Sequence, residues 1–466
     1  MLAIEVQPLR VAIIGAGPAA FYAADALLKQ ANRAIEVDMF DRLPTPFGLV
    51  RGGVAPDHQK IKNVCRVFHK TAMQQGFRFY GNVEFGTDVT RDDLRRHYHM
   101  IVYATGAQTD RSMGIPGEDL AGSHSATEFV AWYNGHPDFR HLTFDLSAEQ
   151  VAIIGVGNVA VDVARILCRT PEELAQTDIA DYALDALRRS RVREVYMLGR
   201  RGPAQAAFTP PEVKELGEME DADCLVTQED VELDPESAAD LESADRNTVR
   251  NVEIMQEFSK NRPSGKSRQL HIRFLVSPVE ILGDSEGRVM GLRVVRNELY
   301  RDERGRLRPR PTGQHEELPA QLVFRSVGYE GVPLPDVPFD ENWSVILNES
   351  GRVLDPKTRH HVTGEYVAGW IKRGPTGVIG TNKADAVETV EAMMQDLQAG
   401  LVLEPAEPSA QAIERLIRER QPRFFTYEDW CRLDQMEIQR GEALGRPRVK
   451  FTSIDEMWAA VRHPPD

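Results

Sequence analysis

Cysteine is scarce in this chain, and its distribution excludes several kinds of redox centre. The 466 residues contain four cysteines, Cys65, Cys168, Cys224 and Cys431, and no two of them form a CxxC pair. A thioredoxin-like dithiol, an iron–sulfur knuckle or a zinc knuckle would therefore lack its ligands. We expect no bound metal, and we interpret the cysteines as buried or inert thiols of a cytoplasmic protein in a reducing compartment.

Long apolar runs and excess positive charge are also missing. No stretch of about 18 residues is apolar enough to cross a bilayer, so the sequence predicts no membrane span. Residues 11–24 are uncharged, but Glu5 and Arg10 precede them, and we interpret this stretch as a strand and helix and not as a signal peptide. The net charge of -15 makes nucleic acid a poor general partner.

What the chain does contain is one nucleotide-binding pattern in two copies. The copies are VAIIGAGPAAFYAADALL at 11–28 and VAIIGVGNVAVDVARIL at 151–167, and each predicts a strand, a glycine turn and a helix. The first glycine permits a tight turn, the second lets the backbone approach a pyrophosphate, and the small third residue lets the helix pack on the strand. The phosphates then lie at the helix N-terminus. The turn residues are Gly15, Gly17 and Ala20 in the first copy and Gly155, Gly157 and Ala160 in the second.

One such turn alone can be a tight connection without a ligand, but two in the same context favour two dinucleotides. The copies differ where their second strands end. The first ends at Asp41, which can accept hydrogen bonds from ribose hydroxyls, whereas the second ends at Arg200-Arg201. Guanidinium groups pair with a 2′-phosphate. This difference assigns FAD to the first copy and NADP to the second.

Several segments between these motifs allow coarser predictions. Residues 170–190 are interpreted as a helical insertion, and the acidic stretch 217–246 as a solvated loop or face. Short strands are expected at 271–275, 279–282, 289–296 and 322–327, and residues 301–310 are expected to form a basic loop.

The destination of the electrons stays open at this point. Disulfide reduction would need a cysteine pair, which the chain lacks. A flavin-dependent NADPH oxidase or monooxygenase remains possible, because oxygen needs no sequence ligand. Transfer to an external one-electron protein is another alternative. A non-catalytic alternative is a dinucleotide-sensing or electron-relay subunit of a larger complex, although such subunits usually bring cysteine-rich segments.

Five stretches carry a more specific resemblance. They are LPTPFGLVRGGVAPDHQKIKNV (43–64), ATGAQTDRSMGIPGED (104–119), GVGNVAVDVARIL (155–167), GRRGPAQAAFTPPEVKEL (199–216) and GWIKRGPTGVIGTNKADAVETV (369–390). In this order they resemble the adrenodoxin-reductase-like ferredoxin–NADP reductases over nearly the whole chain. The tail GRPRVKF (445–451) resembles bacterial members, and the stand-alone form is indicated because no ferredoxin-type cysteine cluster is present.

The resemblance implies an α/β fold with two Rossmann-like dinucleotide-binding domains, the NADP domain (109–330) being inserted into a discontinuous FAD domain (1–108 and 331–466). It also implies His58 and Glu215 near the contact between flavin and nicotinamide. Asp41 stands where the family more often has Glu. The implied FAD contacts are Ala16, Asp41, Leu49, Val89, Trp370, Gly377, Val378 and Ile379. The implied NADP contacts are Arg111, Asn158, Val159, Ala160, Val161, Arg200, Arg201, Glu212 and again Gly377.

The implied activity is NADPH:ferredoxin oxidoreduction, in which a hydride passes from NADPH to FAD and single electrons then pass to a ferredoxin or similar small iron–sulfur protein. The family's partners are acidic, and this chain is acidic too, so docking would need a local basic patch. Two candidate patches are the arginines at 188–193 and the basic loop 301–310.

Overall fold

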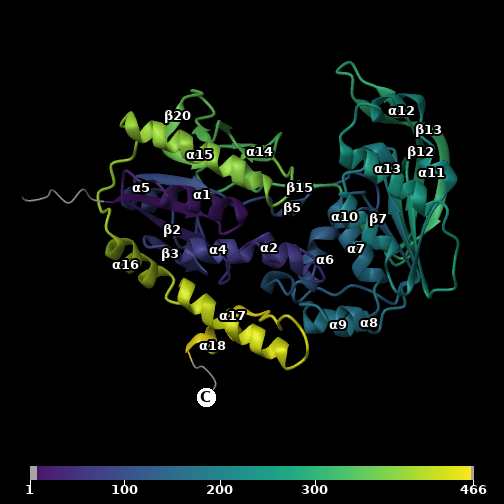
Figure 1. Ribbon diagram of the computed structural model, residues 1–466, viewed down its shortest axis with the longest axis horizontal. Coiled ribbons are helices and arrows are strands. Elements are labelled where there is room, and N and C mark those ends of the chain that lie inside the picture. Colours follow the sequence, from purple (N-terminus) through teal and green to yellow (C-terminus); the bar gives the residue numbers. More distant parts are fainter. Residues whose placement is uncertain (1–7, 463–466) are drawn as a thin grey trace, which may run out of the picture.

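The computed structural model describes residues 8–462 and builds two lobes, each around its own parallel sheet (Figure 1). The first sheet has the order β18-β19-β20-β4-β1-β2-β3, and its parallel part runs from β20 to β3. Its strands are β1 (Leu9–Ile14), β2 (Ile35–Asp41), β3 (Phe77–Gly81), β4 (Met100–Tyr103), β18 (Asn348–Glu349), β19 (Arg352–Leu354) and β20 (His361–Val367). The first lobe is thus built from both ends of the described chain.

The second sheet has six parallel strands in the order β6-β14-β7-β8-β10-β9. They are β6 (Ser123–Ser125), β7 (Gln150–Ile154), β8 (Glu194–Leu198), β9 (Ala222–Val226), β10 (Arg268–Arg273) and β14 (Leu322–Arg325). The chain crosses between the lobes at β5 (Thr109–Asp110) and β15 (Tyr329–Glu330), which pair antiparallel. The predicted domain boundaries at 108/109 and 330/331 fall at this pair of strands, and we propose that the two domains divide there.

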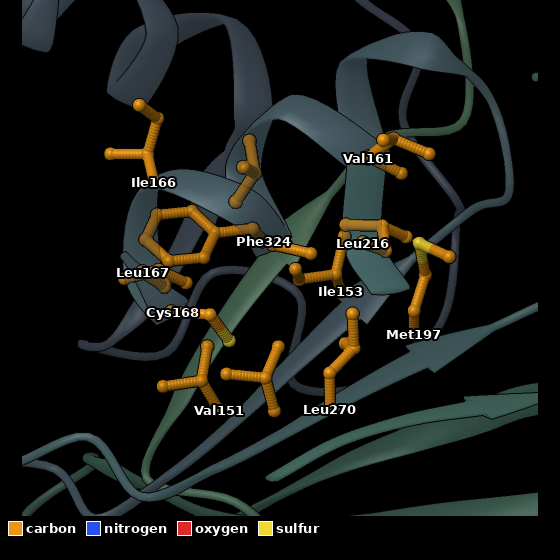
Figure 2. Close-up of a cluster of buried hydrophobic side chains, with 14 of the residues drawn as sticks. Val151, Ile153, Val161, Ile166, Leu167, Cys168, Met197, Leu216, Leu270 and Phe324 are labelled. Atoms are coloured by element: carbon orange, nitrogen blue, oxygen red, sulfur yellow. The ribbon is translucent and has the colours of Figure 1, made fainter. Parts of the chain in front are cut away.

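Both faces of each sheet are covered by apolar side chains. Helix α7 (Asn158–Cys168) packs on one face of the second sheet, where Val161, Ile166 and Leu167 meet strand residues such as Ile153 and Leu270 (Figure 2). The other face is partly covered by a three-stranded antiparallel sheet, β11 (Val276–Gly283), β12 (Val289–Arg301) and β13 (Leu307–Pro319). These continuous apolar runs are what a parallel strand buried on both faces requires.

The first sheet is covered by helices drawn from distant parts of the sequence. Helix α1 (Pro18–Leu28) packs beside α15 (Thr381–Gln398) over one face, and α4 (Cys65–Ala72) packs against α1. Helices α16 (Ala410–Arg420), α17 (Tyr427–Glu442) and α18 (Ile454–Arg462) lie along the lower side of the molecule in Figure 1. Trp430 on α17 is buried in this core, next to Phe47.

The predicted insertion at 170–190 is confirmed as two short helices, α8 (Pro171–Leu174) and α9 (Asp181–Leu187). Neither of the two segments predicted as loops is a loop, although much of the acidic stretch is exposed, as a solvated face would be. The acidic stretch 217–246 contains the edge strand β9 and two helices, α11 (Gln228–Val231) and α12 (Pro235–Leu241). The basic segment 301–310 is the tip of a β-hairpin, since Arg301 pairs with Leu307. Its proline, Pro309, lies on β13, and an edge strand tolerates a residue that has no N–H to donate.

Candidate functional site

The first glycine turn leaves an open, positive helix end. Gly15 has φ +103°, and a Cβ there would lie 2.5 Å from the carbonyl oxygen of Ala104, so a side chain is excluded. Gly17 begins α1 without a side-chain cap, and a Cβ on it would meet no atom within 4 Å. Free backbone N–H groups therefore face open space, which suits a pyrophosphate. Ala20 is fully buried, as its packing role requires.

Asp41 holds this turn in place. One carboxylate oxygen accepts a hydrogen bond from the Ala16 N–H at 2.8 Å, and the other accepts one from the Leu43 N–H at 2.8 Å. Burial raises the pKa of Asp41, and these two hydrogen bonds oppose that effect. Each oxygen keeps a lone pair for a ribose hydroxyl. The shorter side chain of Asp therefore fits the role that the sequence predicts for it.

A second open turn lies in the C-terminal part of the chain that contributes to the first lobe, directly after α14 (Trp370–Arg373). Gly377 has φ +81°, and a Cβ there would overlap the Thr381 side chain. Among residues 8–462, the N–H groups of Val378, Ile379 and Gly380 donate no hydrogen bond, and α15 begins there without a side-chain cap. Val378 is 52% exposed. These donors fit an anionic or carbonyl edge of a flavin ring.

The remaining residues predicted to contact FAD differ in how accessible their side chains are to a ligand. Leu49 begins α2 (Leu49–Gly52) and is 40% exposed, so its side chain is available to a ligand. The Trp370 indole packs on Tyr329 and donates to the Thr376 carbonyl at 3.1 Å. Val89 is 1% exposed and lies in the core, so the structure offers no side-chain contact from this residue.

The second glycine turn repeats the geometry of the first. Gly155 has φ +133°, and a Cβ there would lie 2.1 Å from the Ser326 carbonyl oxygen. Gly157 begins α7 uncapped, and the Asn158 side chain accepts from the Thr209 N–H at 2.8 Å, which ties the turn to the following loop. Val159 is partly buried at this helix end, while the side chains of Ala160 and Val161 are fully buried. Those two could therefore contact a ligand through their backbone alone.

Arg200 and Arg201 form a cationic site just beyond β8. Neither makes an ion pair within 4.0 Å in the described part of the chain. Burial, and then the charges of Arg200 and Arg308, lower the pKa of Arg201. The side chain of Asn297 donates to the Arg200 carbonyl at 2.9 Å and fixes the backbone. Like charges held together without a carboxylate are suited to a phosphate dianion.

His58 lies where the two lobes meet. It belongs to the first lobe, just before α3 (Gln59–Lys62), and its Nε2 is 2.9 Å from a Glu215 oxygen of the second lobe. Its Nδ1 is 3.2 Å from a Glu212 oxygen, which comes from α10 (Pro210–Lys214). Burial would lower the pKa of His58, but the Glu215 hydrogen bond and nearby carboxylates raise it above its ordinary value. The hydrogen bond with His58 correspondingly lowers the pKa of Glu215.

Arg165 on α7 is the centre of this cluster, and the sequence analysis missed it. Its guanidinium is 0% exposed and lies 2.6 Å from Asp57 and 2.7 Å from Asp162. Burial would raise the pKa of Asp57, but Arg165 lowers it to about 2. His58 and these carboxylates could geometrically surround a metal ion. Arg165 supplies the positive charge instead, so we interpret the cluster as an ion network. The sequence did contain one signal for this network, because Asp162 and Arg165 are ionisable residues on the otherwise largely apolar helix α7.

The C-terminal segment joins the lobes at a second place. Arg446 donates to the Thr177 carbonyl at 2.9 Å and pairs with Asp181 at 2.5 Å, both in the second lobe. The buried Lys450 donates to the Asn134 carbonyl and side chain at 3.1 Å. Its Nζ lies 3.6 Å from Asp178, a carboxylate that also accepts from Lys62 of α3 at 2.7 Å. The segment that carries His58 is therefore anchored directly to the opposite lobe.

Arg111 directly follows β5, where the chain crosses between the lobes. It is 49% exposed, and its Nε is 3.5 Å from Glu330 on the paired strand. Its predicted contact with NADP stays a prediction.

Among the described residues, no helix combines the length and the apolar character that a membrane crossing needs.

Comparison with known proteins identifies the family. The model of the pyridine nucleotide-disulphide oxidoreductase family matches residues 9–201. NADPH-ferredoxin reductase FprA of Mycobacterium leprae is 45% identical over 453 residues, covering 96% of this chain and 97% of the relative. The solved structure of Mycobacterium tuberculosis FprA in complex with NADPH is 44% identical with a TM-score of 0.92, covering 98% of this chain and all of the other.

The chain belongs to the adrenodoxin-reductase-like family of ferredoxin–NADP reductases. The mitochondrial NADPH:adrenodoxin oxidoreductase of Arabidopsis thaliana, 39% identical over 98% of this chain and 96% of the relative, shows the same relationship. The predicted resemblance and the predicted fold class are confirmed, and the chain is an oxidoreductase of this family.

Proposed function

We propose that this protein is an FAD-dependent NADPH:ferredoxin oxidoreductase. The observation that carries the proposal is the contrast between two uncapped glycine turns in separate lobes. One is followed by a single carboxylate, Asp41, and the other by Arg200 and Arg201, which make no ion pair with any residue in 8–462. The relatives named above are NADPH-ferredoxin and adrenodoxin reductases, which supports the same conclusion.

In the first lobe, Ala16, Gly17 and Asp41 would bind the adenosine half of FAD, with the pyrophosphate at the N-terminus of α1. Leu49, Trp370 and the 377–379 backbone would contact the flavin half. Bound FAD would supply the conversion of one hydride into two single electrons.

In the second lobe, the uncapped N-terminus of α7 would bind the pyrophosphate of NADP, with Asn158 and Val159 at the turn. Arg200 and Arg201 would bind the 2′-phosphate, because each offers a planar set of donors and neither is occupied by a carboxylate. Glu212, Arg111 and Gly377 would complete the contacts toward the nicotinamide.

His58 and Glu215 would orient the reacting rings and hold a proton beside them. His58 is 8% exposed, and its hydrogen bond to Glu215 and the nearby Asp162 and Asp57 raise its pKa against the opposing effect of burial. The Nε2–H donates to Glu215, so the pair joins the lobes through a charge-assisted hydrogen bond. Asp57 and Asp162 are both bound to Arg165, and an Asp162 oxygen lies 3.8 Å from the Nδ1 of His58. The His58–Glu215 pair would thereby fix the two lobes at a set distance from each other, which is the chief requirement of hydride transfer.

The electron acceptor would be a ferredoxin or similar small iron–sulfur protein, and the protein would work in the cytoplasm. All four cysteines are free, in keeping with a reducing compartment.

Turnover of the purified flavin-loaded chain tests the proposal against its rivals. NADPH should drive reduction of a low-potential ferredoxin or a one-electron dye by the isolated chain, with little oxygen consumed. Oxygen uptake coupled to substrate hydroxylation would favour a monooxygenase. Gel filtration of the chain, combined with absence of turnover in isolation, would favour a relay subunit.

A further inference from the structure

One long stretch of this acidic protein contains no acidic residue. Between residues 58 and 83 there is no Asp or Glu, although the chain as a whole carries a net charge of -15. The stretch contains five lysines and arginines, namely Lys60, Lys62, Arg66, Lys70 and Arg78. Lys62 and Arg78 are bound to Asp178 and Asp38, which leaves three basic residues to explain.

Arg66 and Lys70 of α4 share a surface with exposed apolar side chains, and Lys60 is exposed on the short helix α3 that comes just before α4. Helices α3 and α4 follow each other with linking hydrogen bonds, such as Val64 N–H to the Ile61 carbonyl at 3.3 Å. Helical spacing places Arg66, Lys70 and Met73 on one face, with Val67 beside them. Ile61, Val67 and Met73 are 38%, 50% and 65% exposed. The surface of Lys60, Ile61, Arg66, Val67, Lys70 and Met73 is called the 60–73 face below.

The opposite side of this segment is firmly seated. Phe68 and Ala72 are buried against α1, and His69 hydrogen-bonds Tyr427 of α17 at 3.0 Å. Figure 1 shows α4 next to α2, between α1 and α17. The apolar groups of the 60–73 face are therefore exposed on a rigid element and not on a mobile loop.

The nearby carboxylates are already occupied by other cations. In the described part of the chain, Lys60, Arg66 and Lys70 form no ion pair within 4.0 Å. The acids that approach this segment have partners of their own: Asp25 binds Lys29, Asp178 binds Lys62, and Asp434 binds Arg448. Within residues 8–462, the positive charge of the 60–73 face is thus not neutralised by an ion pair.

The basic patches suggested by the sequence are less suitable for docking at the flavin. Arg189, Arg191 and Arg193 precede β8, so they lie at the amino edge of the second sheet, whereas the glycine turn follows the carboxyl end of β7. In the hairpin 301–310, the arginines at 301, 306, 308 and 310 are paired with acids. The 60–73 face instead begins two residues after His58, at the junction of the lobes.

We propose that the 60–73 face is the docking surface for an acidic electron-transfer protein, a role that rests on the function proposed above. Unpaired positive charge on a protein of net negative charge steers a negatively charged partner to one place and one orientation. The exposed Ile61, Val67 and Met73 then supply the apolar centre that a short-lived interface needs.

Charge reversal tests this surface. The triple variant K60E/R66E/K70E is compared with R189E/R191E/R193E, which changes the net charge equally at the amino edge of the second sheet. The acceptors are an acidic [2Fe–2S] ferredoxin and a neutral small quinone, each assayed with the flavin-loaded enzyme and NADPH over a series of salt concentrations. The circular dichroism and flavin content of each variant check that it is folded.

The first variant should lose about tenfold or more in kcat/KM for ferredoxin at low salt, and its salt dependence should flatten, while quinone reduction stays as in the parent. The second variant should keep both activities. Equal losses in the two variants, or no loss in the first, would overturn the docking surface. Failure of the parent enzyme to reduce ferredoxin while it reduces quinone would contradict the proposed function itself.

Discussion

Removal of both arginines after β8 should convert the preference for NADPH into near indifference between the two coenzymes. A charge-assisted hydrogen bond contributes about 1.5–3 kcal/mol. Arg201 is half-buried, so this range applies to its contribution to binding. Arg200 is exposed, and solvent screening reduces its contribution to about 1 kcal/mol. R200A/R201A should therefore lose about 2.5–4 kcal/mol of binding to the 2′-phosphate, which corresponds to about 10²- to 10³-fold in kcat/KM for NADPH.

The assay is steady-state reduction of a neutral quinone by flavin-loaded enzyme with NADPH or NADH. The NADH value should stay close to that of the parent, because NADH has no 2′-phosphate for these residues to bind. R189A/R191A removes two arginines of the same lobe that also make no ion pair in the described structure, and it should behave as the parent. Equal losses with NADPH and NADH would refute the assignment of the second glycine turn to NADP.

Three further predictions concern the contact between lobes and the turns. E215Q removes the carboxylate that raises the pKa of His58. In a pH profile of the rate of flavin reduction by NADPH, the fall in rate at alkaline pH should therefore begin at lower pH than in the parent. An unchanged profile would contradict the pairing of His58 with Glu215. K450M should lower the free energy of unfolding by about 3 kcal/mol in urea denaturation, since it removes a buried donor and leaves the Asn134 carbonyl and side chain and the Asp178 carboxylate without it, whereas K29M on the surface should have little effect. G155A should lower the free energy of unfolding by about 1–3 kcal/mol or more, because alanine is strained at the positive φ of this position. A variant as stable as the parent would show that the turn does not have this backbone geometry.

The raised pKa of His58 also sets the sign of a stability effect. Its pKa is higher in the folded protein than in the unfolded chain, so its contribution is complete below about pH 6.5 and is lost as the pH rises through the folded value. H58Q should remove this pH-dependent part of the unfolding free energy.

The strands and turns of both dinucleotide units could be predicted from sequence because their signals are local. β1 leads into the first glycine turn and β2 ends at Asp41, as the first copy of the pattern predicts, and Gly15 and Gly155 adopt the positive φ that a tight turn requires. The strand β9 was missed because its short apolar run ADCLV lies at a sheet edge within an acidic segment. The hairpin around 301–310 was missed because proline and arginine suggest a loop when the edge position is unknown.

The network around His58 depends on contacts that sequence does not reveal. Arg165 and Asp57 are 108 residues apart, and His58 and Glu215 are 157 residues apart, so only the folded lobes bring them together. The resemblance indicated His58, Glu212 and Glu215, but no local pattern indicated that a fully buried arginine would hold them. The same applies to Lys450 and Asp178, which meet only because the C-terminal segment returns to the second lobe.

Titration of the purified, flavin-loaded protein with NADP⁺ is the most direct test of the central claim, that two different dinucleotides bind side by side in separate lobes. The account predicts a yellow protein with one FAD per chain that binds one NADP⁺ per chain without releasing flavin, and a weak response to NAD⁺. A protein that holds no flavin, or one from which NADP⁺ displaces FAD, would contradict it.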